Sequence, residues 1–335
     1  MRGDEDGSAA TLWSMASLGT PMAIRVAATL RIADHIAAGL RTTEELAQAA
    51  QAHPGALGRL LRYLTVRGVL DRDDDGGHTL TPLGEALRED HPAGIRAWFD
   101  IEGAGRGELS FVELLHSVRT GEAAFPVRYG RAYWEDLTDE ADRAASFNKL
   151  LGQDVAVRAP GVVEGFDWGT LGHVVDVGGG DGSLLTRLLE AYPALRGTVV
   201  DLPDAALTAK GTFAAAGLGD RADAVAGSFF DALPAGAGGY VLSLILHDWD
   251  DGDAIAILRR CAEAAGDTGS VFVIESIGSA GDAPRTGMDL RMLCVYGAKE
   301  RTVADFGALA SAAGLRVATV HSAGPSAIIE LTAGR

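Results

Sequence analysis

The chain has 335 residues, of which 47% are hydrophobic and 22% are charged, so it can build two globular domains with substantial cores. Its formal net charge of −17 disfavours nucleic acids and anionic membrane surfaces as partners, because both repel an acidic protein. Two cysteines are too few for a disulfide framework, no run of ~18 apolar residues could span a bilayer, and no cluster of side chains suggests a metal site. We therefore expect a soluble, cytoplasmic protein.

The first part of the chain predicts short helices after a polar tail. Residues 1–10 lack the apolar core of a signal peptide and are expected to be disordered. From Met22 to Ile36 the apolar residues recur at helical spacing. Thr42 and Glu45 then form a capping box, which opens a short helix that runs to Ala50.

A third helix begins at Pro54 and is followed by two short strands around the turn at residues 73–77. This succession predicts a winged-helix domain over residues 11–90. Such domains often bind DNA, so a DNA-binding regulator is one hypothesis. The aspartates of the wing would, however, repel the phosphates of DNA. The same module also serves as a dimerisation domain. We therefore expect a homodimer formed through this domain, without nucleic acid binding.

The hydrophobic pattern of the sequence changes at about Val162, where apolar strand patterns begin to alternate with helical ones. The expected strands are residues 173–177, 197–200, 222–226, 239–245 and 270–274. This alternation predicts an α/β domain over residues 161–335, with an open, doubly wound sheet of the Rossmann-like type. Residues 91–160 are expected to be a helical linker.

A glycine-rich loop follows the first of these strands. Gly178, Gly180 and Gly182 alternate with other residues after the strand residue Asp176. A dinucleotide fingerprint would need a glycine at position 183, which is serine, and a phosphate loop would need Lys-Ser or Lys-Thr. The alternating spacing after an acidic residue is instead typical of S-adenosylmethionine sites. A merely tight turn is the competing interpretation.

Further candidate cofactor contacts lie at the ends of the next strands, which share one edge of the sheet. Asp201, followed by Leu202, could accept hydrogen bonds from both ribose hydroxyls, or could only cap the next helix. Ser228 could bind the edge of the adenine, and the ring of Phe229 could cover its face or belong to the core. Ser243, within the fourth expected strand, completes the expected cofactor set.

A histidine, His247, lies just past the fourth strand, and Glu275 ends the fifth. A lone histidine is more often structural than catalytic. This histidine, however, lies at the ligand-binding edge, and neighbouring strand ends bring it near the glutamate. The pair is therefore a candidate for general base catalysis, with the carboxylate orienting the imidazole.

The glycine loop, His247-Asp248-Trp249 and Lys299-Glu300-Arg301-Thr302 together resemble the O-methyltransferases of the caffeic acid and acetylserotonin type. The resemblance extends over nearly the whole chain and is greatest to bacterial members that modify anthracyclines and other aromatic polyketides. It implies transfer of a methyl group from S-adenosyl-L-methionine to a hydroxyl of a small aromatic acceptor, with S-adenosyl-L-homocysteine as the second product. It also implies His247 as the general base, flanked by Glu275 and Glu300.

The resemblance extends to the acceptor and to one alternative activity. Asn148 and Met292 lie in segments that resemble the walls of the acceptor pocket, although Met292 is equally compatible with ordinary core. Plant members have Asp-Met where this chain has Ser228-Phe229, so adenine contacts cannot be copied from them. Some bacterial relatives use the bound cofactor for hydroxylation or decarboxylation, which is the alternative. Because this chain keeps the histidine and both glutamates, we predict O-methylation.

Overall fold

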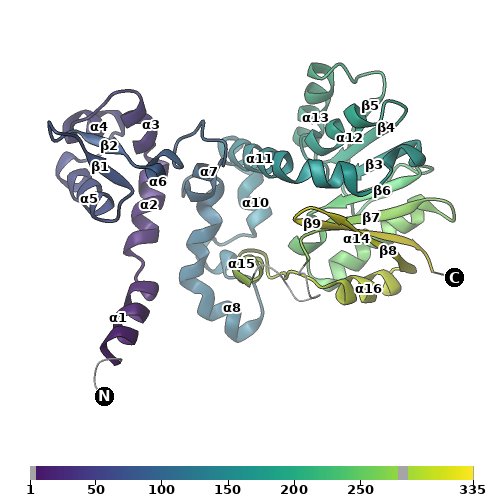
Figure 1. Cartoon of the computed structure of the whole chain (residues 1–335). Helices are drawn as coiled ribbons and strands as arrows, with labels where there is room; N and C mark the ends of the chain where they lie inside the picture. Colours follow the sequence, from purple (N-terminus) through teal and green to yellow (C-terminus); the bar gives the residue numbers. More distant parts are fainter. Residues whose placement is uncertain (1–4, 278–285, 335) are drawn as a thin grey trace. The chain divides into compact units, whose positions relative to one another are not determined.

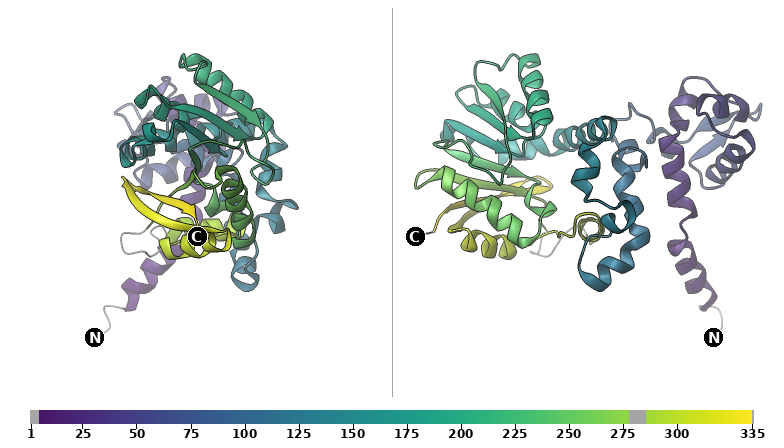
Figure 2. Two further views of the ribbon diagram at one scale, coloured as in Figure 1. Left: turned by 90° about the vertical axis from the view of Figure 1, so that its right-hand side faces the viewer. Right: turned by 180° about the vertical axis from the view of Figure 1, so that it is seen from behind.

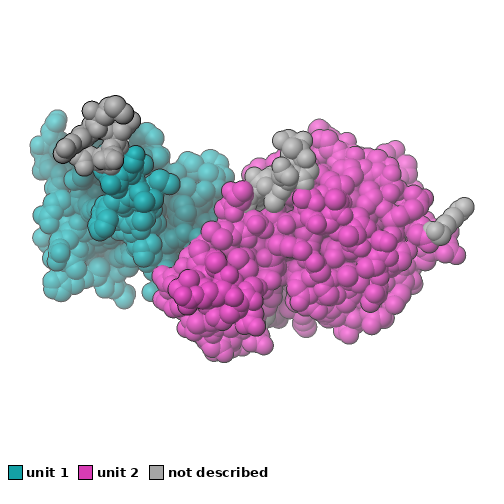
Figure 3. Space-filling view, turned by 90° about the horizontal axis from the view of Figure 1, so that it is seen from below, with its two compact units in different colours: residues 1–109, 140–150 teal, residues 110–139, 151–335 magenta. Residues whose placement is uncertain are grey.

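The computed structural model describes residues 5–277 and 286–334 (Figures 1 and 2). The chain forms two compact units, of which the first comprises Met1–Leu109 with Glu140–Leu150 and the second Ser110–Asp139 with Leu151–Arg335 (Figure 3). The predicted boundaries at residues 90 and 160 remain predictions. Among the described residues, no helix combines the length and the apolar character that a bilayer span needs.

The first unit contains short helices and one antiparallel hairpin. Its helices are α1 (Glu5–Ala16), α2 (Gly19–Thr29), α3 (Ile32–Ala37), α4 (Thr43–Ala49), α5 (Pro54–Val66), α6 (Pro82–Glu85) and α7 (Arg96–Phe99), and its strands are β1 (Leu70–Arg72) and β2 (His78–Leu80). The predicted capping box is present, since the Thr42 hydroxyl accepts from the Glu45 amide. The expected order of helices and hairpin is therefore found.

Two details of the amino-terminal prediction are wrong. Residues 5–10 belong to α1 and are not a disordered tail, whereas residues 1–4 lie outside the described residues. The alanines of this segment are strong helix formers, which a judgement from polarity alone overlooks. The helical pattern of residues 22–36 is divided between α2 and α3, because Arg31 between them has a left-handed φ of 53°.

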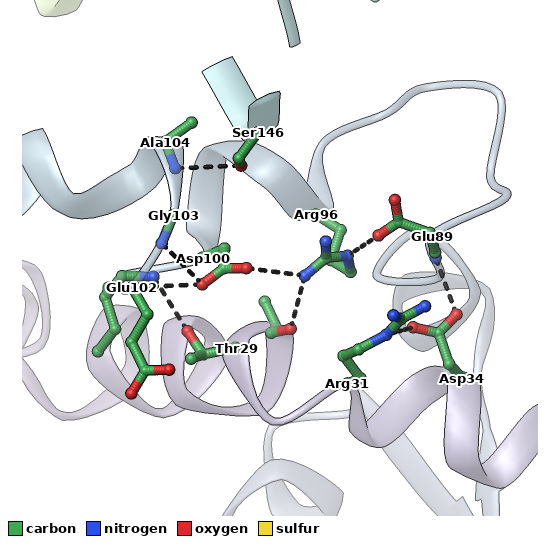
Figure 4. Close-up of polar contacts among 12 residues, drawn as sticks. Thr29, Arg31, Asp34, Glu89, Arg96, Asp100, Glu102, Gly103, Ala104 and Ser146 are labelled. Carbon is green, nitrogen blue, oxygen red and sulfur yellow. Dashed lines mark hydrogen bonds and ion pairs between the residues drawn. The ribbon is translucent and has the colours of Figure 1, made fainter. Parts of the chain in front are cut away.

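A polar network within the first unit fixes the segment after the hairpin to α2 and α3 (Figure 4). The Arg96 guanidinium pairs with Glu89 and Asp100 and donates to the Ala28 carbonyl at 3.2 Å. The carboxylate of Asp34 accepts from the Glu89 amide at 2.9 Å. Since the Arg96 side chain is only 12% exposed, the link depends on charges that the fold has partly removed from water.

The second unit contains the main sheet and the helices that cover it. Its helices are α8 (Leu114–Thr120), α9 (Phe125–Tyr129), α10 (Tyr133–Thr138), α12 (Ser183–Ala191), α13 (Pro203–Ala215), α14 (Asp251–Ala265), α15 (Thr286–Tyr296) and α16 (Val303–Ala312), with the 3-10 helices η2 (Trp168–Leu171) and η3 (Leu246–Asp248). The helices α11 (Ala141–Gly165) and η1 (Ala104–Glu113) contribute residues to both units.

In the described chain the sheet has seven strands in the order β5-β4-β3-β6-β7-β9-β8. The strands are β3 (His173–Val177), β4 (Arg196–Asp201), β5 (Ala222–Ala226), β6 (Gly239–Ser243), β7 (Ser270–Glu275), β8 (Leu315–Ala323) and β9 (Ser326–Ala333). The first five pair in parallel, whereas β9 is antiparallel to β7 and β8 to β9. The predicted doubly wound sheet is thus confirmed, and its strand order reverses between β3 and β6, where such folds bind ligands.

Each face of the sheet packs against its own layer of helices (Figure 2). On β3, Val174 packs with the cluster that includes α12 and α13, while Val175 and Val177 pack with the cluster of α14 and α16. This alternation follows from the two-residue period of a strand. Because both faces are covered, the carboxyl ends of the strands are left to form the site.

Candidate active site

The glycine loop between β3 and α12 has the predicted left-handed backbone. Gly178, Gly180 and Gly182 have φ values of 74°, 57° and 76°. A Cβ atom at Gly179 would lie 2.6 Å from the carboxyl group of Asp176, so a side chain there would not fit. The loop therefore needs glycine, and it offers bare backbone to a ligand.

Asp201, at the end of β4, anchors this loop. Its Oδ2 accepts from the Gly180 amide at 2.8 Å and its Oδ1 from the Leu202 amide at 2.6 Å. Burial raises the pKa of Asp201, and these two hydrogen bonds oppose that shift. Each carboxylate oxygen keeps a further lone pair, so the side chain can still accept two hydroxyl groups. Leu202 contributes its backbone, and its side chain is 52% exposed.

A second carboxylate, Asp176, is buried next to the loop. Burial, with help from neighbouring carboxylates, raises the pKa of Asp176 to about 7. In the part of the chain that the structure describes, its Oδ2 has no hydrogen-bond partner. Arg158, on α11, lowers that pKa and donates to the Ser243 hydroxyl at 3.3 Å. The sequence analysis missed Arg158, because nothing in its helical segment distinguishes it from an exposed arginine.

These groups fit S-adenosylmethionine. The orphaned oxygen of Asp176 suits an ammonium group, the guanidinium of Arg158 suits a carboxylate, and Asp201 suits a ribose.

The aromatic residues after β5 lie beside the same loop. The rings of Phe229 and Phe230 meet that of Trp249 edge to face, with centroids 5.5 and 5.0 Å apart. A Cβ atom at Gly178 would be 3.6 Å from the Phe229 ring, and the Ser228 hydroxyl accepts from the Phe230 amide at 3.2 Å. Phe229 packs against the core, which agrees with the core interpretation, and its contact with adenine stays a prediction.

The candidate base and its predicted partners come together at the same edge. His247 lies on η3, and its Nδ1 is 3.5 Å from Glu275 Oε2 and 3.4 Å from Glu300 Oε1. On the other side of the ring, Nε2 is 3.5 Å from Asp248 Oδ1. Both glutamate side chains are at most 3% exposed, whereas the imidazole is 13% exposed. The imidazole is thus held by buried carboxylates and retains some access.

These carboxylates determine the proton affinity of the imidazole. Burial disfavours the imidazolium, but the charges of Glu275, Asp248 and Glu300 outweigh it and raise the pKa of His247 to about 10. Burial also raises the pKa of Glu275 to about 7, although the imidazolium opposes that shift. The cluster therefore binds a proton tightly at the histidine, and this proton must be lost before the imidazole can act as a general base.

The expected acceptor residues are separated by the division into units. Met292 lies on α15 in the second unit and is 2% exposed, which agrees with the core interpretation. Asn148 lies on the part of α11 that belongs to the first unit, and its side chain is outside the described set. The structure does not bring the two together within one unit.

An aromatic group that the sequence analysis missed lies close to η3, against which α15 packs. Tyr296 on α15 stacks on Trp134 at 5.4 Å and meets Tyr133 edge to face at 5.1 Å. Arg291, on the same helix, donates to the Tyr296 hydroxyl and lowers the pKa of Asp248 against the effect of burial. Aromatic side chains so near the base could line a site for a planar acceptor.

A parallel sheet with this glycine loop, a carboxylate at the end of β4 and a carboxylate-held histidine defines an S-adenosylmethionine-dependent methyltransferase. Family models agree with this class: residues 111–316 match the O-methyltransferase domain, and residues 14–90 match the O-methyltransferase dimerisation domain. The chain belongs to this O-methyltransferase family, as predicted.

Three similar proteins place the chain within the family. It is 56% identical to 2,7-dihydroxy-5-methyl-1-naphthoate 7-O-methyltransferase of Streptomyces carzinostaticus, over 96% of this chain and 97% of the relative. It is 42% identical to aclacinomycin 10-hydroxylase RdmB of Streptomyces purpurascens, over 96% and 90% of the two chains. A solved structure of the O-methyltransferase NcsB1 from neocarzinostatin biosynthesis, in complex with S-adenosylmethionine and 2-hydroxy-5-methyl naphthoic acid, superposes with a TM-score of 0.92. That structure is 55% identical in sequence, and the match covers 96% of this chain and 98% of the other.

The histidine cluster predicts opposite titration behaviour for two histidines. In protein labelled with carbon-13 at the imidazoles, His247 should titrate far above ~6.5, the ordinary value, because of its carboxylates. His173, at the start of β3, should titrate below that value, because burial lowers its pKa. Replacing Glu300 by Gln should move only the His247 midpoint downwards. A wild-type His247 midpoint at or below the ordinary value would contradict the electrostatic description of the site.

Proposed function

We propose that the protein methylates a hydroxyl of a small aromatic natural product of the polyketide type, with His247 as the general base. The observation that carries this proposal is the contact of His247 with Glu275 and Glu300 at the edge of the sheet that also bears the glycine loop. A nucleophile must be generated next to the cofactor, and this cluster is the group there that can remove a proton.

The cofactor is S-adenosylmethionine, which supplies an electrophilic methyl group and leaves as S-adenosylhomocysteine. Asp201 would hold its ribose, with the Leu202 amide and the loop from Gly178 to Gly180 fixing that carboxylate. Asp176 and Arg158 would hold the charged ends of the amino acid portion. Ser228 and Phe229 would contact the adenine, and Ser243 would support Arg158. These residues position the ligand, and alignment is a large part of what catalysis of a methyl transfer needs.

His247 would take the hydroxyl proton on Nε2, the ring nitrogen that does not face the glutamates. Glu275 and Glu300 would stabilise the resulting imidazolium at Nδ1, as the carboxylate of a catalytic triad does. The raised pKa of His247 matches that of a phenol, which is ~10, so the proton transfer is nearly balanced in energy. At neutral pH the imidazole of the enzyme without acceptor is mostly protonated. It must lose that proton to solvent before it can take the proton of the acceptor hydroxyl, and this second transfer produces the reactive pair of imidazolium and phenolate.

The names of similar proteins suggest the acceptor class. The relative from Streptomyces carzinostaticus methylates a dihydroxy-naphthoate, and the superposable structure contains a naphthoic acid. We infer a fused-ring phenol as the acceptor; the assignment of Met292 and Asn148 to its binding stays a prediction. The aromatic group of Trp134 and Tyr296 also suits such a planar ligand.

A second candidate function is hydroxylation, which is favoured by the 42% identity to aclacinomycin 10-hydroxylase. The intact cluster of His247 with two glutamates argues for methyl transfer, because a hydroxylation would not need a base poised against a phenol.

The proposed ribose contact predicts the effect of one substitution on cofactor affinity. Asp201→Ala should weaken binding of S-adenosylhomocysteine by about 1.5–3 kcal/mol, the usual cost of losing hydrogen bonds to a charged acceptor. Asp204→Ala, at an exposed carboxylate on the first turn of α13, serves as the matched control and should leave affinity unchanged. Calorimetry measures both. Equal affinities for the two variants would remove Asp201 from the site.

The proposed base predicts a loss of turnover without loss of cofactor. His247→Ala should bind cofactor as wild type does and should turn over roughly 10²–10⁴-fold more slowly. In the wild type, kcat/KM should rise with pH above neutrality, because deprotonation produces the reactive pair. The variant should recover partly at high pH, where the acceptor is already a phenolate. His173→Ala, at the opposite end of the sheet, should remain active; undiminished methyl transfer by His247→Ala would exclude this mechanism.

We also propose that the protein is a homodimer through its amino-terminal domain and does not bind DNA. Residues 14–90 match the family's dimerisation domain, and α1 exposes Leu12, Trp13 and Met15, whose side chains are 66–80% exposed. Apolar surface of this kind is typical of an interface between subunits. Light scattering at micromolar concentration should give twice the mass of the chain, and Trp13→Glu should shift the protein towards the monomer. A monomeric wild type, or a footprint on DNA at physiological salt, would contradict this proposal.

A further inference from the structure

Arg301 is a fully buried charge next to the base, and the mechanism above gives it no task. It lies between α15 and α16, directly after Glu300, and its side chain is 0% exposed. A buried guanidinium is costly unless its donors are satisfied. The positions of its partners therefore indicate what it does.

Its partners lie on both sides of the turn that carries His247. Nη1 donates to the Leu246 carbonyl, and Nη2 donates to the Trp249 carbonyl at 2.8 Å. Nη2 and Nε also reach one carboxylate oxygen of Asp251, the first residue of α14, at 2.7 and 3.2 Å. The donors of one planar guanidinium group thus contact the start of the turn, its end and the helix that follows it.

Backbone strain lies just before this turn. Leu244, directly after β6, has a φ of 55°, a left-handed conformation that leucine rarely adopts. Strained residues at functional sites persist only where surrounding contacts hold them. Leu244 is held by its own amide, which donates to the Ile274 carbonyl at 3.0 Å, and Arg301 holds the residues that follow, through the Leu246 and Trp249 carbonyls.

The charge of Arg301 is compensated away from the imidazole. Its hydrogen bond to Asp251 is the largest cause of the lowered pKa of that carboxyl. The charged groups that shift the pKa of His247 are instead the three carboxylates around it. Arg301 can therefore influence the base through geometry, by fixing the turn relative to the neighbouring Glu300.

We propose that Arg301 is a positioning residue, which holds the turn from Leu246 to Trp249 so that His247 Nδ1 faces the glutamates and Nε2 faces the acceptor. This inference rests on the proposed role of His247 as the base. It assigns the arginine of the Lys299–Thr302 segment a task distinct from that of Glu300, which touches the imidazole itself.

A purely structural arginine would have the same kind of contacts, and the chain contains one for comparison. Arg221, directly before β5, donates to the carbonyls of Leu189 and Leu195 at 3.2 and 3.0 Å. It lies at the amino end of the parallel strands, away from the site. Substitution of Arg221 should therefore show how much stability is lost when an arginine no longer bonds backbone carbonyls, without affecting a base.

The test compares Arg301→Lys, Arg301→Ala and Arg221→Lys in the full chain, with S-adenosylmethionine and a naphthol acceptor. Arg301→Lys should lower kcat by about 10–100-fold, with KM and cofactor affinity within about twofold, because small misplacements of a catalytic group have effects of this size. The rise of kcat/KM with pH should move to lower pH, since an imidazole less well held against its carboxylates has a lower pKa. Millimolar guanidinium should restore part of the activity of Arg301→Ala and should not stimulate the wild type. Arg221→Lys should lower the melting temperature and leave the pH profile unchanged.

A folded Arg301→Lys protein with wild-type kcat and pH profile would overturn the proposal. The same conclusion follows if Arg221→Lys reproduces its kinetic effects, or if guanidinium fails to rescue Arg301→Ala. Should the arginine variants not fold, Asp251→Asn, at a side chain that is 52% exposed, should give a smaller shift of the pH profile in the same direction, and an unchanged profile would count against the proposal. If His247→Ala keeps full activity, the proposed function fails first; a dead His247→Ala with a normal Arg301→Lys refutes only the positioning role.

Discussion

The site depends on the balance between burial and charge at one imidazole. Burial alone would make His247 a weaker base, since it disfavours the imidazolium. The charges of Glu275, Asp248 and Glu300 reverse this effect, and both glutamates are nearly inaccessible to water. Buried carboxylates are costly by themselves, so the cluster is stable only when its members remain together. Both the fold and the proposed chemistry therefore require the strand ends to meet as they do.

The parallel sheet provides this meeting point. The strands β3, β4, β6 and β7 place their carboxyl ends along one edge, so residues far apart in sequence become neighbours. The proposed ribose contact of Asp201 would link ligand binding to the loop, because the same carboxylate holds the Gly180 amide. The turn after β6 then carries His247 over the end of β7, where Glu275 lies. The proposed cofactor-binding residues and the proposed base thus lie along one edge of the sheet, which suits a reaction that is sensitive to alignment.

Much of this arrangement could be predicted from the sequence because it follows from local patterns. The strands at 173–177 and 222–226 have the predicted bounds, since apolar runs between turn residues leave little choice. The capping box at Thr42 is likewise local chemistry. The proximity of His247 and Glu275 could be predicted by adding one rule of topology, that parallel strand ends share an edge.

The residues that were missed act over long distances in sequence. Arg158 and Arg301 are distinguished only by burial and by partners 85 and 55 residues away, which no spacing rule reveals. Tyr296 joins Trp134 only after α15 packs beside that region, and the left-handed Arg31 interrupts a pattern that looks continuous in sequence. The prediction of a tail failed at residues 5–10 because polarity was given more weight than alanine content.

We propose that this site uses its cofactor to transfer a methyl group to an oxygen. Mass spectrometry of the product formed from S-adenosylmethionine and a dihydroxy-naphthoate, with and without molecular oxygen, tests it most directly. Methyl transfer should give a product heavier by one methylene, formed equally well under both conditions, with one S-adenosylhomocysteine per turnover. A product heavier by one oxygen atom, formed only when molecular oxygen is present, would contradict it.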